Sequence, residues 1–462
     1  MNWGIYYRYS THGSHMLAAL VERVTGQSFY EFIKNNLFQL LGIHNIIMPS
    51  YYIWTIGCQM NRAESERLVD GLARQGYVSS TSADKADLII LNTCVVRGSA
   101  EDRVINKLVN MKVIKNRRPE VRIAVTGCFV SDDAAALKAR FPFVDYFFPA
   151  GAVPDWASSF PQESIEKTGV CTYVPIIQGC NNFCTYCIVP YRRGREKSRP
   201  VIDIVQEVKG LVAGGTREVT LLGQNVDSYG HDLPDRPDLA DLLAELSDIS
   251  DLWRIRFLTN HPKDMDMRLI QAIADLEKVC ENVNLPVQAG DDDILRAMNR
   301  GYTVAHYRAL AATLRSKVPG ISLTTDVIVG FPGETEIQFN NTSQLLRELK
   351  FGAVHVAAYS PRTGTPAALL SDDVAPEVKK ERLALIEKQQ ETLVGEANAA
   401  LLGTMVEVLV ESRQKGKWQG RGRNDKLVFF TGGEDLIGRL VMVRIDQTGP
   451  WSLQGKTEQV VK

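Results

Sequence analysis

The sequence lacks the features of a membrane-bound, secreted or disordered protein. None of its apolar runs approaches the ~18 residues that a membrane span needs. The first residues, MNWGIYYRYSTHGSH, lack the basic start and apolar run of a secretory signal. Hydrophobic residues make up 45% and charged residues 23% of the 462 residues, which excludes a largely disordered or collagen-like chain. We therefore expect a cytoplasmic protein without membrane contact, folded into about three domains of ~150 residues.

Histidine is absent from the region that holds most of the cysteines, since none lies between His44 and His231. The motif GCNNFCTYC places three cysteines there at C-x3-C-x2-C spacing, and we call Cys180, Cys184 and Cys187 the loop cysteines. A structural zinc site normally needs a fourth ligand nearby, and a disulfide would leave one thiol unpaired. Three thiolates on one loop can instead hold three irons of a [4Fe–4S] cluster and leave the fourth iron open.

A second group of cysteines follows a different pattern, because each ends an apolar run. We call Cys58, Cys94 and Cys128 the sheet cysteines; the runs are 51–58, 86–94 and 122–128. Amphipathic stretches lie between the runs, as in a parallel sheet with crossover helices. The carboxyl ends of parallel strands meet at one edge, so the three thiols can converge on a metal site. The alternative is three separate buried thiols. Cys171 and Cys280 lack a partner at ligand spacing, which favours structural roles.

The patterns predict an α/β chain of several parts. Residues 49–160 are expected to form a Rossmann or flavodoxin-like parallel sheet, and a Pro- and Ser-rich segment (154–169) a linker. Six strand–helix units in 166–395 predict a partial (β/α)6 barrel. Short strands separated by glycine in 400–462 predict a small antiparallel β-barrel.

Several motifs together resemble one family. The C-x3-C-x2-C loop after the first strand of a six-unit β/α sheet resembles the radical S-adenosylmethionine (SAM) superfamily. GCQMN (57–61), LLGQNVDSYG (221–230) and TTDVIVGFPGETE (324–336) resemble the methylthiotransferases, in particular the branch that modifies N6-isopentenyladenosine in tRNA. The C-terminal part resembles the TRAM domain, which contacts RNA.

The resemblance implies a mechanism with two [4Fe–4S] clusters and no catalytic side chain. The loop cysteines would hold the radical-SAM cluster and the sheet cysteines an auxiliary cluster that carries the sulfur. One SAM would donate a methyl group and a second would generate the radical that activates C2 of N6-isopentenyladenosine, next to the anticodon. An electron donor such as flavodoxin or ferredoxin is implied, while the sulfur source stays open.

The resemblance also implies which residues bind SAM. They sit in the cluster loop or at the ends of later strands, and a turn or supporting role is the alternative for each. These expected SAM contacts are Tyr186, Gly223, Gln224, Asn225, Gln288 and Gly330.

A net charge of −1 excludes a uniformly basic surface, so RNA contact requires local patches. Basic residues gather in 191–199 (YRRGREKSR) and in 413–426 (RQKGKWQGRGRNDK). Basic side chains bind phosphates and an aromatic ring can stack on an unpaired base, although a solvated loop is the alternative. We expect RNA contacts from Arg413, Lys415, Lys417, Trp418, Arg421 and Arg423.

Residues 1–48 do not follow the methylthiotransferase pattern. They resemble a fragment of serine β-lactamase-like hydrolases in which Thr11 replaces the usual Asn, and we expect an appended segment without function. The alternative functions are methylthiolation of threonylcarbamoyladenosine in tRNA or of a ribosomal protein aspartate. A non-catalytic iron–sulfur carrier, an RNA-binding module and a serine hydrolase are more distant alternatives.

Overall fold

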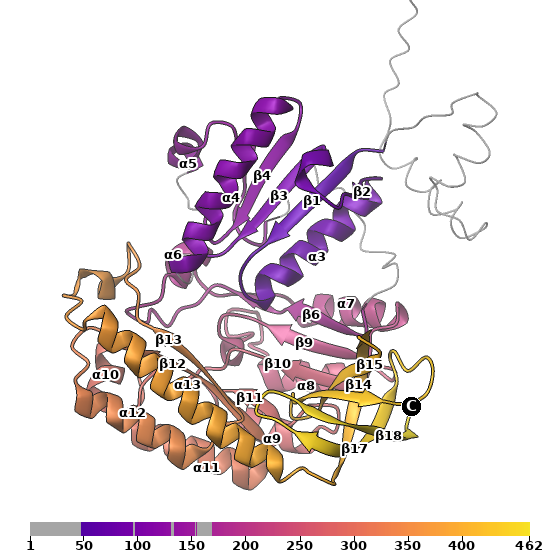
Figure 1. The fold of residues 1–462 in the computed structure, drawn as a ribbon, viewed down its shortest axis with the longest axis vertical. Coiled ribbons are helices and arrows are strands. Elements are labelled where there is room, and N and C mark those ends of the chain that lie inside the picture. Colours follow the sequence, from indigo (N-terminus) through magenta and orange to yellow (C-terminus); the bar gives the residue numbers. More distant parts are fainter. Residues whose placement is uncertain (1–47, 96–97, 131–133, 153, 155–168) are drawn as a thin grey trace, which may run out of the picture.

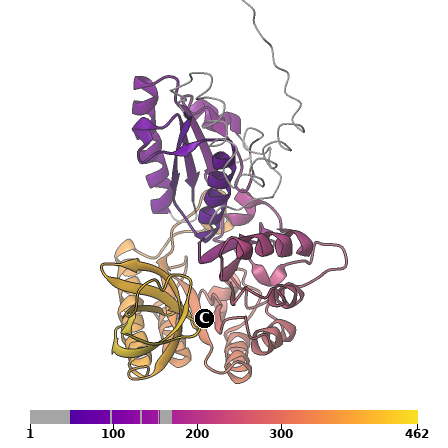
Figure 2. The same cartoon turned by 90° about the vertical axis from the view of Figure 1, so that its right-hand side faces the viewer.

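Three structural units follow one another along the chain (Figure 1), drawn in indigo, in magenta to orange, and in yellow. Figure 2, turned by 90°, shows the first unit above the other two. No helix among the described residues is long and apolar enough to cross a membrane. The predictions for residues 1–47 and for most of the linker lie outside the described residues. The computed structural model describes residues 48–95, 98–130, 134–152, 154 and 169–462.

The first unit is a parallel sheet between helices, as predicted. Its central strand is buried along its whole length, because Ile89 and Leu91 pack toward α4 while Leu88 and Ile90 pack toward α3. The carboxyl ends of β1, β3 and β4 therefore meet at one edge. In the described residues the strand order is β2 (Val78–Ser79), β1 (Ser50–Thr55), β3 (Leu88–Thr93), β4 (Arg122–Gly127), β5 (Tyr146–Phe147), and the helices are α3 (Gln59–Arg74), η2 (Ala83–Lys85), α4 (Gly98–Arg117) and α5 (Ala134–Arg140).

The second unit is a partial barrel of parallel strands, which confirms the predicted architecture. Two three-stranded sheets are joined by a bridge between Ile255 and Val279. The strands follow the order β6 (Cys171–Pro175), β9 (Glu218–Leu222), β10 (Arg254–Phe257), β11 (Asn282–Asn284), β12 (Ser322–Val329), β13 (Ala353–Ala358). The described helices are α6 (Val189–Arg193), α7 (Val201–Ala213), η4 (Val226–Ser228), α8 (Leu239–Ser247), α9 (Met267–Asp275), α10 (Asp292–Ala297), α11 (Val304–Lys317), α12 (Glu336–Leu349), η5 (Pro366–Leu369), α13 (Pro376–Ala399).

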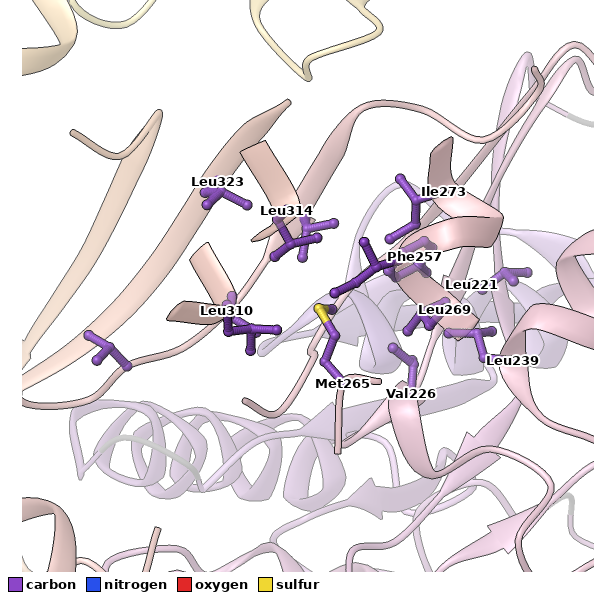
Figure 3. Close-up of a cluster of buried hydrophobic side chains, with 14 of the residues drawn as sticks. Leu221, Val226, Leu239, Phe257, Met265, Leu269, Ile273, Leu310, Leu314 and Leu323 are labelled. Carbon is purple, nitrogen blue, oxygen red and sulfur yellow. The ribbon is translucent and has the colours of Figure 1, made fainter. Parts of the chain in front are cut away.

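The core of the second unit lies between its strands and its outer helices. Figure 3 shows Leu221 and Phe257 from the strands beside Leu269 and Ile273 from α9. All four side chains are buried. Burial of such a side chain stabilises the fold by ~1.5–3 kcal/mol, so this packing fixes the strands whose ends carry the site.

The third unit is a small closed barrel that differs from the prediction in one pairing. β16 and β18 are parallel, whereas the sequence predicted an entirely antiparallel barrel. The chain crosses the barrel between these strands, so one parallel pair closes it. Its order is β14 (Met405–Gln414), β15 (Lys417–Gly422), β16 (Leu427–Thr431), β18 (Leu453–Val460), β17 (Leu440–Thr448).

Two buried arginines of β10 join the small barrel to the second unit. Arg256 donates from Nη1 to the Arg423 carbonyl and from Nη2 to the Gly422 carbonyl, both at 2.7 Å. Its Nε donates to Glu218 at 2.9 Å. Arg254 donates to the Arg421 carbonyl at 2.7 Å. We call these contacts the barrel joint; they hold the end of β15 against the partial barrel.

Candidate functional site

The sheet cysteines lie at one edge of the first unit. Cys58 follows β1, Cys94 follows β3 and Cys128 follows β4. The buried amide of Asn61 organises this edge, because its Oδ1 accepts a hydrogen bond from the Cys58 thiol at 3.3 Å and its Nδ2 donates to the Thr93 carbonyl at 2.8 Å. The Cys128 backbone N–H donates to the same carbonyl at 2.9 Å. The fold thus brings together the three strand ends that carry these cysteines.

Glycines directly before two of the sheet cysteines allow this close approach. Gly57 has a φ of 136°, and a β carbon there would lie 2.8 Å from Cβ of Cys94. Gly127 has a φ of 91°, and a β carbon there would overlap the Thr93 carbonyl. Only glycine adopts these backbone conformations without strain. These two Gly-Cys pairs of the first unit therefore reflect the crowding of three strand ends.

The loop cysteines lie between β7 (Ile177–Gln178) and α6, in a tight turn where the Cys187 N–H donates to the Cys184 carbonyl at 2.9 Å. The buried Arg300 donates from Nη1 to Sγ of Cys184 at 3.3 Å. Burial and the neighbouring Cys184 raise the pKa of Cys187 to about 12, so a metal bound by its thiolate would displace a proton.

One cavity of about 750 Å³ adjoins both sets of cysteines. The loop cysteines all line it, and Cys58 lines it from the sheet set. Cys94 and Cys128 are buried and are not part of its lining. Residues of the small barrel, including Arg421 and Trp451, line the same cavity. All three units therefore contribute residues to the lining of one cavity.

Four of the expected SAM contacts line this cavity: Tyr186, Gly223, Gln224 and Gln288. The other two do not. Asn225 is buried and donates from Nδ2 to Asp264 at 2.7 Å, and the Gly330 N–H donates to Glu334 at 2.6 Å. Both residues bond to other loop residues and are not part of the cavity lining.

Both cysteine sets have the chemistry of iron–sulfur ligands. None of the eight cysteines, all of them in the described residues, forms a disulfide. N–H groups donate to sulfur in each set, from Arg193 to Cys128 at 3.1 Å and from Arg300 to Cys184 at 3.3 Å. Across the described chain no three His, Cys, Asp or Glu side chains are grouped to hold a single metal ion. In a [4Fe–4S] cluster each thiolate binds a different iron, so three thiols can hold such a cluster and leave one iron open.

A buried polar group joins Asp227, which follows β9, to Asn260 and His261, which follow β10 and line the cavity. Asp227 accepts hydrogen bonds from the Asn260 amide and from the His261 backbone N–H. Burial raises the pKa of Asp227 to about 7 and lowers the pKa of His261 to about 2. Nδ1 of the neutral His261 ring accepts from the Lys263 N–H at 3.2 Å, which leaves Nε2 protonated. The polar sequence TNHP at the end of an apolar run was the available signal.

Trp418 lies inside the small barrel, which makes the prediction that it stacks on a base wrong. Its side chain is only 4% exposed, and its Nε1 donates to the Gly433 carbonyl at 3.0 Å. The guanidinium of Arg413 lies 4.9 Å from the ring centre. The tryptophan therefore belongs to the barrel core and supports the surface arginine.

The expected basic RNA contacts divide into exposed and bonded residues. Arg421 lines the cavity and bonds to Asp425 at 3.2 Å. Arg423 forms an ion pair with Glu281 at 2.7 Å across the barrel joint, so its charge is already neutralised. Arg413, Lys415 and Lys417 are exposed, and Lys417 also donates from Nζ to Gln454 at 2.6 Å.

Family comparisons agree with this arrangement of units. Residues 174–346 match the Radical SAM superfamily, residues 50–149 match "Uncharacterized protein family UPF0004", and residues 399–457 match the TRAM domain. Solved structures of the radical S-adenosylmethionine methyltransferase TsrM from Kitasatospora setae are similar in fold. One has a TM-score of 0.51 at 14% identity, covering 70% of this chain and 74% of that chain.

Curated relatives match nearly the whole chain. A tRNA-2-methylthio-N(6)-dimethylallyladenosine synthase of Dehalococcoides mccartyi (strain CBDB1) is 54% identical over 418 residues, which cover 90% of this chain and 100% of the relative. A protein of the same name from Chloroflexus aurantiacus is 47% identical over 422 residues, covering 88% of this chain and 91% of the relative. The chain therefore belongs to the family of the tRNA-2-methylthio-N(6)-dimethylallyladenosine synthases, within the radical SAM superfamily.

Proposed function

We propose that this chain methylthiolates C2 of N6-isopentenyladenosine (dimethylallyladenosine) next to the anticodon of tRNA, with SAM as methyl donor and radical source. The observation that carries the proposal is the single cavity that adjoins both cysteine sets, in a chain 54% identical to a synthase of that name. Sulfur insertion and radical formation must act on the same substrate atom, and one shared cavity allows this.

The six cysteines are proposed as cluster ligands in two sets. The loop cysteines would hold one [4Fe–4S] cluster and the sheet cysteines would hold the other. When bound, the clusters supply the electron that cleaves SAM and the sulfur that is inserted. Arg300 and Arg193 contribute N–H donors to sulfur, and such bonds raise the reduction potential of a cluster.

The protein's own side chains position SAM and the base. Tyr186, Gly223, Gln224 and Gln288 line the cavity and are proposed to contact SAM. Gln224 is held in place because its Oε1 accepts the Gly179 N–H at 2.5 Å. Asn225 and Gly330 are proposed to fix the adjoining loops.

RNA is proposed to approach along the small barrel. The exposed Arg413, Lys415 and Lys417 can bind phosphates, and Arg421 reaches the cavity itself. A tRNA substrate places the reaction in the cytoplasm, where a donor such as flavodoxin or ferredoxin would supply electrons. Methylthiolation of threonylcarbamoyladenosine or of a ribosomal protein aspartate is less favoured, because the relatives described above carry the dimethylallyladenosine name.

Nucleoside mass spectrometry tests the function. tRNA from a host without its own synthase is analysed with and without expression of this chain. We expect 2-methylthio-N6-isopentenyladenosine to appear only with the chain. Persistence of the unmodified precursor, with iron bound at both cysteine sets, would overturn the substrate assignment.

Replacement of single cysteines tests the division of roles. Cys184→Ala should abolish SAM cleavage, whereas Cys94→Ala should retain SAM cleavage and lose the methylthio product. Cys171→Ala is the control, because this thiol lies on β6 outside both sets. Product formation by Cys94→Ala at the wild-type rate would remove the sheet cysteines from the mechanism.

A further inference from the structure

Arg193 connects the two cysteine sets. It is the last residue of α6, the helix that begins two residues after Cys187. Its side chain is only 2% exposed and crosses to the first unit, where it forms an ion pair with Glu64 at 2.6 Å. Glu64 lies on α3, the helix that begins directly after Cys58. One ion pair thus joins the segments that follow a cysteine of each set.

The same guanidinium contacts the sheet cysteines. Nε of Arg193 donates to Sγ of Cys128 at 3.1 Å. Nη2 donates to Oδ1 of Asn61 at 3.4 Å, the same oxygen that accepts the Cys58 thiol. Arg193 therefore reaches Cys128 directly and Cys58 through one amide.

We propose that Arg193 is a positioning residue that fixes the sheet cysteines relative to the loop cysteines and tunes the cluster held by the sheet cysteines through its bond to Cys128. The inference rests on the proposed assignment of that cluster. A planar guanidinium can hold a carboxylate with its two Nη groups while Nε remains available to sulfur, a division that a lysine ammonium cannot reproduce. Glu64 neutralises the buried cation, which fits the high cost of an unpaired buried charge.

Two conservative variants should shift the reduction potential of the auxiliary cluster in opposite directions. Arg193→Lys keeps the charge but loses the N–H bond to sulfur, so the reduction potential of the auxiliary cluster should fall, since that bond stabilises the more negative reduced state. Glu64→Gln keeps the shape but removes a nearby negative charge, so the potential should rise. General damage to the interface would not shift the two variants in opposite directions.

The potential is measured on the full chain with Cys180, Cys184 and Cys187 replaced by alanine and reconstituted with ferrous iron and sulfide. In this background only the sheet cysteines bind a cluster, and redox titration followed by electron paramagnetic resonance gives its potential. Arg382→Lys is the matched control, because Arg382 forms an equally buried ion pair with Glu334 at 2.7 Å inside the second unit. We expect no shift of the potential in this control.

Coupling is measured in the otherwise unmodified enzyme as 5′-deoxyadenosine formed per methylthio product. Arg193→Lys should raise this ratio several-fold, because SAM cleavage persists while the sheet cysteines lose their fixed position. An unchanged potential and ratio in Arg193→Lys would overturn the inference, as would an equal shift in Arg382→Lys. If the chain with Cys180, Cys184 and Cys187 replaced by alanine binds no iron at the sheet cysteines, the proposed function itself is overturned. Failure of the inference and failure of the proposed function therefore give different results.

Discussion

The barrel joint predicts that one substitution will release the small barrel from the rest of the protein. Arg256→Met removes a guanidinium that bonds to the carbonyls of Gly422 and Arg423 and to Glu218. Arg256 is 5% exposed and Glu218 is 3% exposed, so water does not replace the lost partners. Among the described residues, Arg254, with Nη1 3.8 Å away, is the ion-pair partner that remains for Glu218.

The size of the effect follows from the burial of these groups. A charged donor bonded to a buried carbonyl contributes ~1.5–3 kcal/mol, and removing one partner of a buried ion pair costs ~3–5 kcal/mol. These two free-energy contributions are not added, because one guanidinium makes all three bonds. We therefore expect the joint to lose ~3–5 kcal/mol, which raises the population of its open state roughly 100- to 4,000-fold.

Cys280 provides a built-in probe of this opening, because its thiol is 1% exposed and lies directly before Glu281, the partner of Arg423. Alkylation of Cys280, followed by mass spectrometry of its peptide, should accelerate in Arg256→Met in proportion to the open population. Arg444→Met is the control, since its pair with Glu458 on the barrel surface is exposed and is worth ~0–1 kcal/mol. Equal rates of Cys280 labelling in Arg256→Met and the wild type would refute this account of the joint. An equal acceleration in Arg444→Met would show that labelling reports general loosening of the small barrel.

Two further predictions concern an exposed ring of the cavity lining and the N-terminal segment. Trp451 is 63% exposed on the turn between β17 and β18 and lines the cavity. Trp451→Ala should therefore weaken binding of an anticodon stem-loop about 5- to 100-fold by loss of stacking, whereas Trp451→Phe should retain most of the binding. Fluorescence anisotropy measures both affinities, and wild-type binding by the alanine variant would exclude stacking. Deletion of residues 1–47 should leave methylthiolation unchanged, because the family matches begin at residue 50; a folded but inactive truncation would contradict this.

The convergence of the sheet cysteines could be predicted from the sequence because it depends on local pattern alone. Each of Cys58, Cys94 and Cys128 ends an apolar run, and strand order in a parallel sheet brings such ends together. The contact of Arg193 with Glu64 could not be predicted in this way. It joins residues in two different units, and no periodicity in either segment encodes how the units pack.

The strand pattern around Trp418 contains a signal against the predicted RNA contact. Lys417 and Trp418 belong to a strand whose side chains alternate between exposed and buried positions. This alternation places Trp418 on the same face as Gly420 and Gly422, where a small barrel has room for one large ring. The basic residues around Trp418 suggested RNA, but the strand period of two determines which face a side chain occupies. Trp451 follows a Gly-Pro turn, where that period ends and the ring stays exposed.

Helix α13 shows why a clear period can still be missed. Its buried positions recur every three or four residues, as in any helix packed on one face, and α13 lies against β13. Four of these six positions are polar, so a search for apolar periodicity does not detect the helix. Lys379 bonds to Asp372, Arg382 to Glu334 and Asn398 to the Gly449 carbonyl, and each bond holds a different loop. The polar side chains that obscure the apolar period of α13 are therefore the ones that connect this helix to the second unit and the small barrel. The buried positions are Lys379, Arg382, Ile386, Gln390, Val394 and Asn398.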